Sequence, residues 1–388
     1  MGDINGDGYS DLVASSPYST AAKGTVYIFH STGANGITAT NISSANSSVV
    51  GESSNDNFGN SVSVGDINGD GYADLIASAF GYPTSAGNGR IYVFHSSGSN
   101  GITAANISSA NSTITGNSVF DNLGIFISTG DVNGDGFADL AAGAYGYPGG
   151  SLNGAVFIFH SSGAGGITAT TPTVADSKII GGTSGDYIGV SVCFGDINGD
   201  GYSDLAVGAK GTSSNKGNVY LFYSSGTSGI TASNVSAANT SILGMTANDQ
   251  FGFSISLGDV NGDGYADLAA SAISYSGGNN KGIVYLFNST GSSGISVNSV
   301  NNATNLISGS SNSDSLGYFT SMGDYNGDGY PDLAIAAKGY NAGSLIGRVY
   351  IFHSNTQQGI IAGTVSSANS VITGSSTNDS LGTALPVF

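Results

Sequence analysis

A ten-residue segment that recurs six times constrains this chain more than any other feature. Its second copy, residues 66–75, reads Asp-Ile-Asn-Gly-Asp-Gly-Tyr-Ala-Asp-Leu. Every copy has aspartate at positions 1, 5 and 9, asparagine at position 3, and glycine at positions 4 and 6. Carboxylate and amide oxygens on alternating residues are ligands that Ca²⁺ prefers, and the glycines allow the positive φ angles of a tight wrap. Each copy is therefore predicted to be a calcium loop.

The predicted ligands are the side chains at positions 1, 3, 5 and 9 and the backbone carbonyl at position 7. They are Asp3, Asn5, Asp7, Tyr9, Asp11, Asp66, Asn68, Asp70, Tyr72, Asp74, Asp131, Asn133, Asp135, Phe137, Asp139, Asp196, Asn198, Asp200, Tyr202, Asp204, Asp259, Asn261, Asp263, Tyr265, Asp267, Asp324, Asn326, Asp328, Tyr330 and Asp332. One cation per loop gives about six Ca²⁺ in all.

An EF-hand is excluded by the residues that follow the loop. An EF-hand needs a bidentate glutamate at position 12 and a helix on each side. Position 12 is apolar in every copy, for example Ala77 in the second and Val207 in the fourth. The run from Leu75 to Ala79 is short, apolar and partly branched, which is typical of a buried strand. The loop is therefore expected to join two strands.

The spacing between loops predicts the fold. Successive copies start 63 to 65 residues apart, which indicates a repeat architecture. In the second repeat, strands are expected at residues 58–64, 75–79, 90–95 and 113–116. Four antiparallel strands that are apolar on both faces must be covered by a neighbouring sheet on each side. We therefore expect an all-β fold, a β-propeller of six four-stranded blades.

The two ends of the chain fit a closed ring. Met1 and Gly2 occupy the place of Met322 and Gly323 in the sixth repeat, so the first repeat lacks its opening strand. Residues 378–385 supply an opening strand with no loop after it. The two pieces together are expected to complete one blade with strands from both termini, so that residues 1–388 form a single propeller domain.

The net charge of −18 points to metal ions. Eighteen of the 26 acidic residues are loop aspartates. Six others precede the opening strands, where a role in turns is expected; they are Asp56, Asp121, Asp186, Asp249, Asp314 and Asp379. Only eight residues are Lys or Arg, which disfavours a nucleic-acid partner. No segment is apolar and long enough for membrane insertion. Because calcium is millimolar outside cells, an extracellular or cell-surface location is expected.

These motifs resemble FG-GAP repeats, the family that includes the propeller of integrin α subunits, related microbial surface proteins and a fungal lectin. The resemblance rests on the loop and on the pair that opens each repeat, such as Phe58-Gly59 and Leu123-Gly124. It implies a β-propeller with calcium on one face and ligand contacts on the opposite face. Integrin propellers have seven blades with metal in only some, so a seven-bladed relative is the alternative to six.

No catalytic grouping interrupts the repeats, so we expect no enzyme activity. The preferred interpretation is an extracellular adhesion or recognition module that binds a protein or glycan ligand. The alternatives are a structural protein that self-associates into a surface layer or filament, and a lectin-like carbohydrate binder. Aromatic residues in the loops opposite the metals are the candidate ligand contacts. They are Tyr18, Tyr82, Tyr147, Tyr275 and Tyr340.

Overall fold

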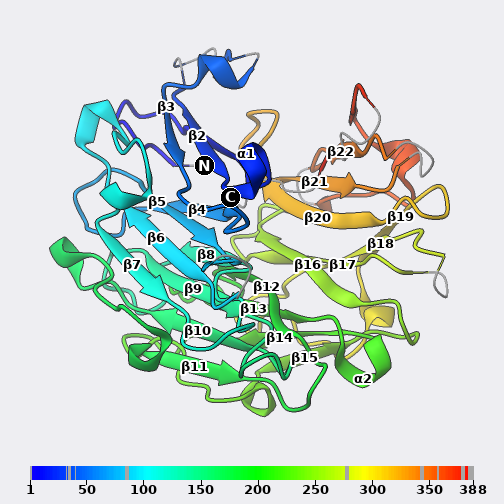
Figure 1. The fold of residues 1–388 in the computed structure, drawn as a ribbon. Coiled ribbons are helices and arrows are strands. Elements are labelled where there is room, and N and C mark those ends of the chain that lie inside the picture. Colours follow the sequence, from blue (N-terminus) through cyan, green and yellow to red (C-terminus); the bar gives the residue numbers. More distant parts are fainter. Residues whose placement is uncertain are drawn as a thin grey trace.

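Six antiparallel sheets follow one another around a ring (Figure 1). The computed structural model describes residues 2–31, 33, 36–39, 41–83, 87–275, 279–340, 345–355, 358–376 and 381–382. Each sheet is one sequence repeat, and the colours in Figure 1 pass from blue to orange around the ring in chain order. The predicted fold class, an all-β propeller of six blades, is confirmed.

The strands of each blade are consecutive in sequence. The first blade contains β1 (Leu12–Ser16), β2 (Thr25–Phe29) and β3 (Ser47–Val50). The second contains β4 (Phe58–Gly65), β5 (Asp74–Ala79), β6 (Arg90–Phe94) and β7 (Ser112–Thr115). The third contains β8 (Ile127–Gly130), β9 (Asp139–Ala144), β10 (Ala155–Phe159) and β11 (Ser177–Ile180).

The other three blades have the same plan. The fourth contains β12 (Ile188–Gly195), β13 (Asp204–Ala209), β14 (Asn218–Phe222) and β15 (Thr240–Leu243). The fifth contains β16 (Phe251–Gly258), β17 (Asp267–Ala272), β18 (Ile283–Phe287) and β19 (Asn305–Ser308). The sixth contains β20 (Leu316–Gly323), β21 (Asp332–Ala337), β22 (Arg348–Phe352) and β23 (Ser370–Thr373). Two four-residue helices, α1 (Ser19–Ala22) and α2 (Thr212–Asn215), lie in the connections between second and third strands.

The second blade shows how the sequence places its strands. Gly65 pairs with Asp74, so the predicted calcium loop is the hairpin between β4 and β5. The register shifts between Phe58 and Val62, where a bulge bends the start of β4. The second strand, Asp74–Ala79, is buried at every position, as its apolar and small residues predict. The loops of all blades therefore lie at the end of the first strand, on one face of the ring.

The described residues next to the two chain ends, Gly2 and Leu381, make bridges that agree with a shared blade. Among the described residues the first blade has three strands, with a bridge between Gly2 and Asp11 in place of a fourth. Leu381 makes a parallel bridge with Gly347 of the sixth blade. In the same way Leu316, the first residue of β20, makes a parallel bridge with Gly282 of the fifth blade. The rest of the predicted C-terminal strand, including Asp379, lies outside the described residues.

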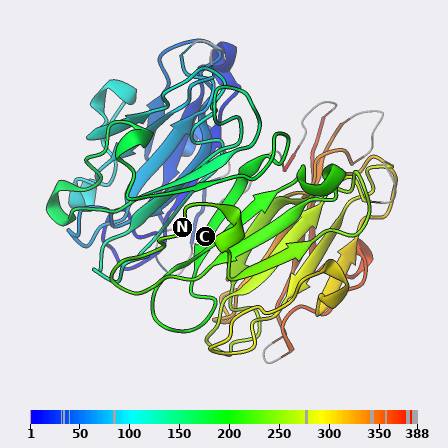
Figure 2. The same ribbon diagram turned by 90° about the horizontal axis from the view of Figure 1, so that it is seen from below.

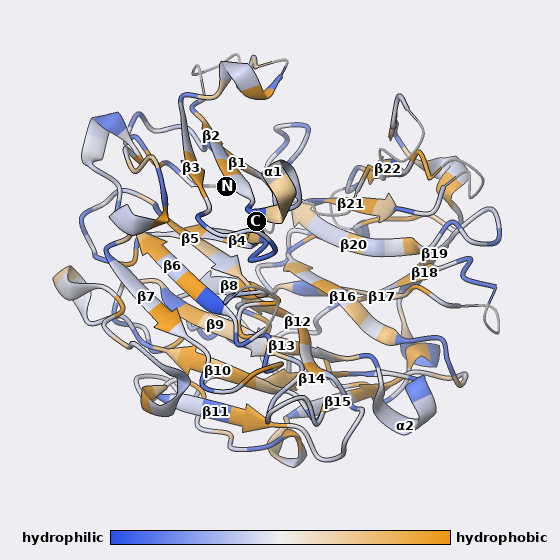
Figure 3. Cartoon of the chain, viewed as in Figure 1, coloured by the Kyte–Doolittle hydropathy of each residue, from blue (hydrophilic) through white to orange (hydrophobic). Residues whose placement is uncertain are grey.

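The hydrophobic core lies between the blades. One cluster joins Ile76 and Ile91 of the second blade to Ile127, Leu140 and Phe157 of the third. Figure 3 shows the hydrophobic residues concentrated on the strands, and Figure 2 shows the blue and cyan blades opposite the yellow and orange ones, with green blades between them. Similar clusters join each pair of successive blades from the first to the sixth, so the second to fifth blades are each stabilised by apolar burial against two neighbours.

Within the described part of the chain, no helix is both long and apolar enough to cross a membrane. The remaining short elements are 3₁₀ turns, most of which precede an outer strand. They are Ile42–Ser44, Gly98–Asn100, Ile107–Ser109, Gly163–Gly165, Pro172–Val174, Val235–Ala237, Val300–Asn302 and Val365–Ser367.

Candidate functional site

The predicted calcium loops fold around their first aspartate. In the second blade, Oδ1 of Asp66 accepts hydrogen bonds from the N–H groups of Gly69 at 2.7 Å and Asp70 at 3.1 Å. Its Oδ2 accepts from the N–H of Gly71 at 2.9 Å. Gly69 and Gly71 have φ of 73° and 88°, which explains why glycine occupies positions 4 and 6. The loop is thus a compact turn with its carboxylates on the surface.

The aspartate at position 9 has a different environment. Asp74 is buried, and its two oxygens accept hydrogen bonds from the N–H groups of Ile67 and Ser96 at 3.1 and 2.8 Å. The pKa of Asp74 is raised to about 7, mainly by burial and also by the negative charges of Asp70 and Asp66, against the lowering effect of its hydrogen bonds. The loop therefore concentrates negative charge around a buried carboxyl group.

The position-9 aspartates of the other blades behave in the same way. Burial is the main cause of a raised pKa in each, and at Asp204 and Asp267 the pKa is about 7, at Asp139 about 6. The pKa values of Asp11 and Asp332 are also raised, again mainly by burial.

The donor chemistry of the loops fits calcium, although their side chains are not arranged as a preformed cage. The predicted ligands are all hard oxygens, and no ion pair with Lys or Arg neutralises them among the described residues. In that same part of the chain, no group of three or more His, Cys, Asp or Glu side chains is arranged to hold a metal ion. In the second loop the oxygens of Asp66, Asn68 and Asp70 accept hydrogen bonds from loop N–H groups.

The aspartates that precede the opening strands are parts of turns, as predicted. Asp121 accepts hydrogen bonds from the N–H groups of Ser118 and Gly149 at 3.1 and 2.7 Å. Asp186 accepts from the N–H of Thr183 at 2.9 Å. Such bonds fix the entry into each first strand, so these residues have a structural role.

The five candidate tyrosines are not brought together. Tyr82 and Tyr340 lie beneath the guanidinium groups of Arg90 and Arg348, 3.7 and 3.6 Å from the ring centroids. Tyr147 and Tyr275 are partly buried and pack against hydrophobic clusters between blades. Tyr18 is 66% exposed and lines a pocket at the centre of the ring.

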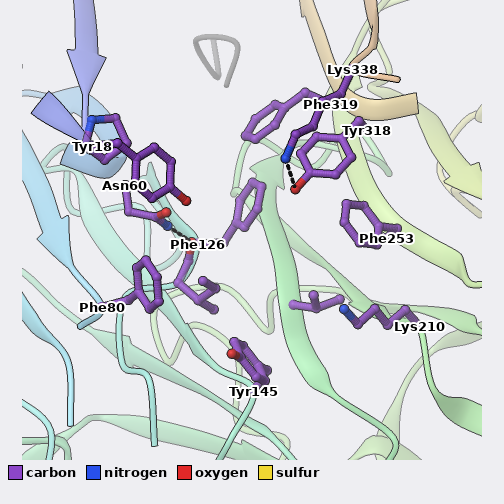
Figure 4. Close-up of a pocket in the computed structure, with 13 residues that line it drawn as sticks. Tyr18, Asn60, Phe80, Phe126, Tyr145, Lys210, Phe253, Tyr318, Phe319 and Lys338 are labelled. Carbon is purple, nitrogen blue, oxygen red and sulfur yellow. Dashed lines mark hydrogen bonds between the residues drawn. The ribbon is translucent and has the colours of Figure 1, made fainter. Parts of the chain in front are cut away.

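That pocket was not anticipated from the sequence. Figure 4 shows it, with aromatic side chains and two lysines, Lys210 and Lys338, around a cavity of about 260 Å³. Most of its lining comes from two repeat positions: the third residue of the opening segment of a repeat, such as Asn60, and the residue after the second strand, such as Phe80. Phe126 and Phe319 come from the position next to the first of these, and Tyr18 from the position next to the second. These positions differ in residue type from blade to blade, and that variation within an otherwise regular repeat is the signal that marks them.

The comparisons with known proteins agree with the repeat structure. The FG-GAP repeat model matches residues 1–29, 58–94, 123–159, 188–222, 251–287 and 316–352. Four of the matched segments begin at the first residue of a blade's first strand, and the segment 123–159 begins four residues before β8. All five end at the last residue of the blade's third strand. Together the segments cover more than half of the chain.

Curated relatives resemble the chain over part of its length. Integrin alpha-PS2 of Drosophila melanogaster is 30% identical over 259 residues, which is 64% of this chain and 17% of that protein. Phosphatidylinositol-glycan-specific phospholipase D of Bos taurus is 32% identical over 177 residues, 43% of this chain and 21% of that protein. The chain spans between 13% and 22% of the length of these and six further curated relatives.

Among solved structures, the V. cholerae biofilm matrix protein Bap1 is similar with a TM-score of 0.39 and 18% sequence identity. The similarity covers 81% of this chain and 40% of that one.

Proposed function

The chain belongs to the FG-GAP repeat family, and from this we propose that it is a calcium-stabilised, non-enzymatic module for extracellular adhesion or recognition. The observation that carries the proposal is the repetition of one oxygen-rich loop in all six blades, each with a buried carboxyl group and, among the described residues, no ion pair with Lys or Arg. In this proposal about six Ca²⁺ are held by the side chains at positions 1, 3, 5 and 9 and the carbonyl at position 7.

The role of calcium would be to neutralise the loops and hold their hairpins. Bound cations offset the repulsion among Asp66, Asp70 and Asp74 and favour the ionised form of the buried Asp74. Because the loops lie on one face, the opposite face is left for a protein or glycan ligand. An extracellular or cell-surface setting follows from the weak, surface-exposed nature of such sites, which millimolar calcium would fill.

Native mass spectrometry tests this proposal directly. We expect a monomer of residues 1–388 that carries about six Ca²⁺ in calcium buffer and none after chelation. Chelation should also lower the melting temperature, since ligand that binds only the folded state stabilises it. A spectrum without bound calcium at millimolar concentrations would refute the metal assignment. If residues 1–388 form a single domain, the melting curve should show one transition.

Self-association is a second candidate, and one structural difference between blades favours it. The outer strand β23 of the sixth blade is exposed at all four residues, with Ile372 at 53%, whereas the equivalent Ile114 and Ile179 of other blades are fully buried. Exposed outer strands offer pairing groups to another chain. A ladder of oligomers in the same native spectra, dependent on protein concentration, would support this function instead.

A further inference from the structure

The pocket on the ring axis has a composition unlike the rest of this acidic protein. All six blades contribute to its lining, so it lies where they converge. Its residues are at the starts of first strands and the ends of second strands, which places it on the face opposite the predicted calcium loops. In Figure 4 the labelled aromatic rings surround a central space.

The inner wall of the pocket is aromatic. Phe126 of the third blade and Phe319 of the sixth stack with centroids 5.2 Å apart and an interplanar angle of 23°. Phe253 and Tyr318 form a second pair at 5.3 Å. Rings held in this way offer flat apolar faces, which favour contact with the apolar face of a ring-shaped ligand.

Two lysines bring positive charge to this aromatic wall. Lys338 Nζ donates a hydrogen bond to the hydroxyl of Tyr318 at 3.2 Å and lies 4.4 Å from its ring centroid. Lys210 Nζ lies 4.9 and 5.2 Å from the centroids of Phe253 and Tyr187. Burial lowers the pKa of Lys210. Each ammonium group has three donors, so both retain donors that these contacts do not use.

None of the described residues that line the pocket is Asp or Glu, although the chain has 26 acidic residues and only eight Lys and Arg. In the described part of the chain, no ion pair joins Lys210 or Lys338 to an acidic side chain. A half-buried ammonium group without a counterion is costly, so the pocket is matched to an anionic ligand.

We propose that this axial pocket binds a small carboxylate carried on a ring, with the carboxylate between Lys210 and Lys338 and the ring against the aromatic wall. The pocket proposal rests on the proposed recognition function and makes it more specific, because it names a ligand class for the face opposite the predicted calcium loops. The volume of about 260 Å³ is below the range of about 300–1,000 Å³ for drug-sized ligands, so one ring fits and a longer ligand would extend into solvent. Hexuronates and aromatic acids both have this chemistry.

Titration calorimetry of the calcium-loaded protein tests the pocket with three probes. Glucuronate is a sugar acid, benzoate an aromatic acid, and glucose a neutral ring of sugar size. We expect at least one of the two carboxylates to bind with a millimolar Kd and glucose not to bind measurably. Binding of glucuronate alone would identify a sugar acid as the source, and binding of benzoate alone an aromatic acid.

Matched lysine variants locate the binding. Lys210→Met and Lys338→Met keep the apolar stem and remove the charge, and each should weaken carboxylate binding about tenfold or more. Lys178→Met is the control, because Lys178 Nζ also contacts a tyrosine hydroxyl, that of Tyr147 at 3.4 Å, but lies outside the pocket. Melting curves confirm that each variant is folded.

Three outcomes would overturn the inference: no binding of either carboxylate, equal binding of glucose, or undiminished binding in the folded Lys210→Met and Lys338→Met variants. Failure here is distinguishable from failure of the proposed function. A protein that retains about six calcium ions but ignores both carboxylates refutes only the pocket assignment.

Discussion

The hydroxyl of Ser96 donates a hydrogen bond of 2.6 Å to the carbonyl oxygen of Ile4, which belongs to the loop of the preceding blade. The N–H of Ser96 donates in turn to Asp74 in its own blade's loop. Equivalent serine hydroxyls bond to the preceding loop in the next four blades. The predicted calcium loops are therefore linked in series from the first blade to the sixth.

We expect Ser96→Ala to lower the free energy of unfolding by about 1–3 kcal/mol, because the buried carbonyl of Ile4 loses its partner. Ser31 is the matched control: its N–H also donates to the position-9 aspartate, but among the described residues its hydroxyl makes only a 3.5 Å contact with Gly33. Urea unfolding of both variants in saturating calcium makes the comparison. Equal losses would show that the link between loops contributes nothing.

A second contact joins neighbouring loops through an aromatic ring. The ring of Phe137 covers Gly69 so closely that a Cβ on Gly69 would lie 2.0 Å from Phe137 Cε1. We expect Gly69→Ala to destabilise the protein by about 1–3 kcal/mol more than Gly327→Ala, because overpacking is added to the strain of positive φ. Gly327 occupies the same loop position with a similar φ of 78°, but nothing lies within 4 Å of its Cβ direction.

The measurement is again unfolding by urea in calcium buffer. A Gly69→Ala, Phe137→Ala double variant should recover part of the loss, since removal of the ring removes the clash. If Gly69→Ala and Gly327→Ala cost the same, positive φ alone explains glycine at position 4.

The fold could be predicted from the sequence because its determinants are local and repeated. The strand bounds follow from apolar runs such as Leu75 to Ala79, and the hairpins from the loop motif. Two features could not be predicted from the sequence. The hydrogen bonds between neighbouring loops join residues about 90 positions apart, and the axial pocket is lined by residues from all six blades. Tyr18 illustrates the difficulty: it aligns with Gly81 of the next repeat rather than with Tyr82, and it alone of the five tyrosines lines the pocket.

One loop aspartate should control one calcium ion. We expect Asp70→Ala to reduce the number of bound Ca²⁺ by one, because the second loop loses an oxygen ligand. At calcium concentrations near 100 times Kd, one site contributes about 2.7 kcal/mol of stability, and the variant should lose about that much of the calcium-dependent stabilisation. Glu52→Ala removes the same charge but lies outside the predicted calcium loops, so this variant should retain all of its calcium ions. Unchanged stoichiometry in Asp70→Ala would show that the loop assignment is wrong.

A histidine at the boundary between blades should make stability depend on pH. The Nε2 atom of His95 is buried and has no hydrogen-bond partner among the described residues, and a Cβ on Gly166 of the next blade would lie 2.8 Å from it. Burial lowers the pKa of His95, against the opposing effect of Asp70. The unfolded chain therefore binds a proton more readily at this site than the folded protein, so stability is present above the ordinary histidine pKa of about 6.5 and is lost as pH falls through it.

We expect the melting temperature in saturating calcium to fall between pH 7.5 and 5.5, and to fall less in His95→Asn. Asparagine is the suitable replacement, because Asn288 follows the third strand β18 as His95 follows β6. Asparagine does not titrate, so it removes only the protonation cost of this site. The remaining pH dependence in the variant reports the other histidines and the loop carboxylates. A pH profile identical to that of the unmodified protein would mean that His95 takes up its proton without a cost in the folded state.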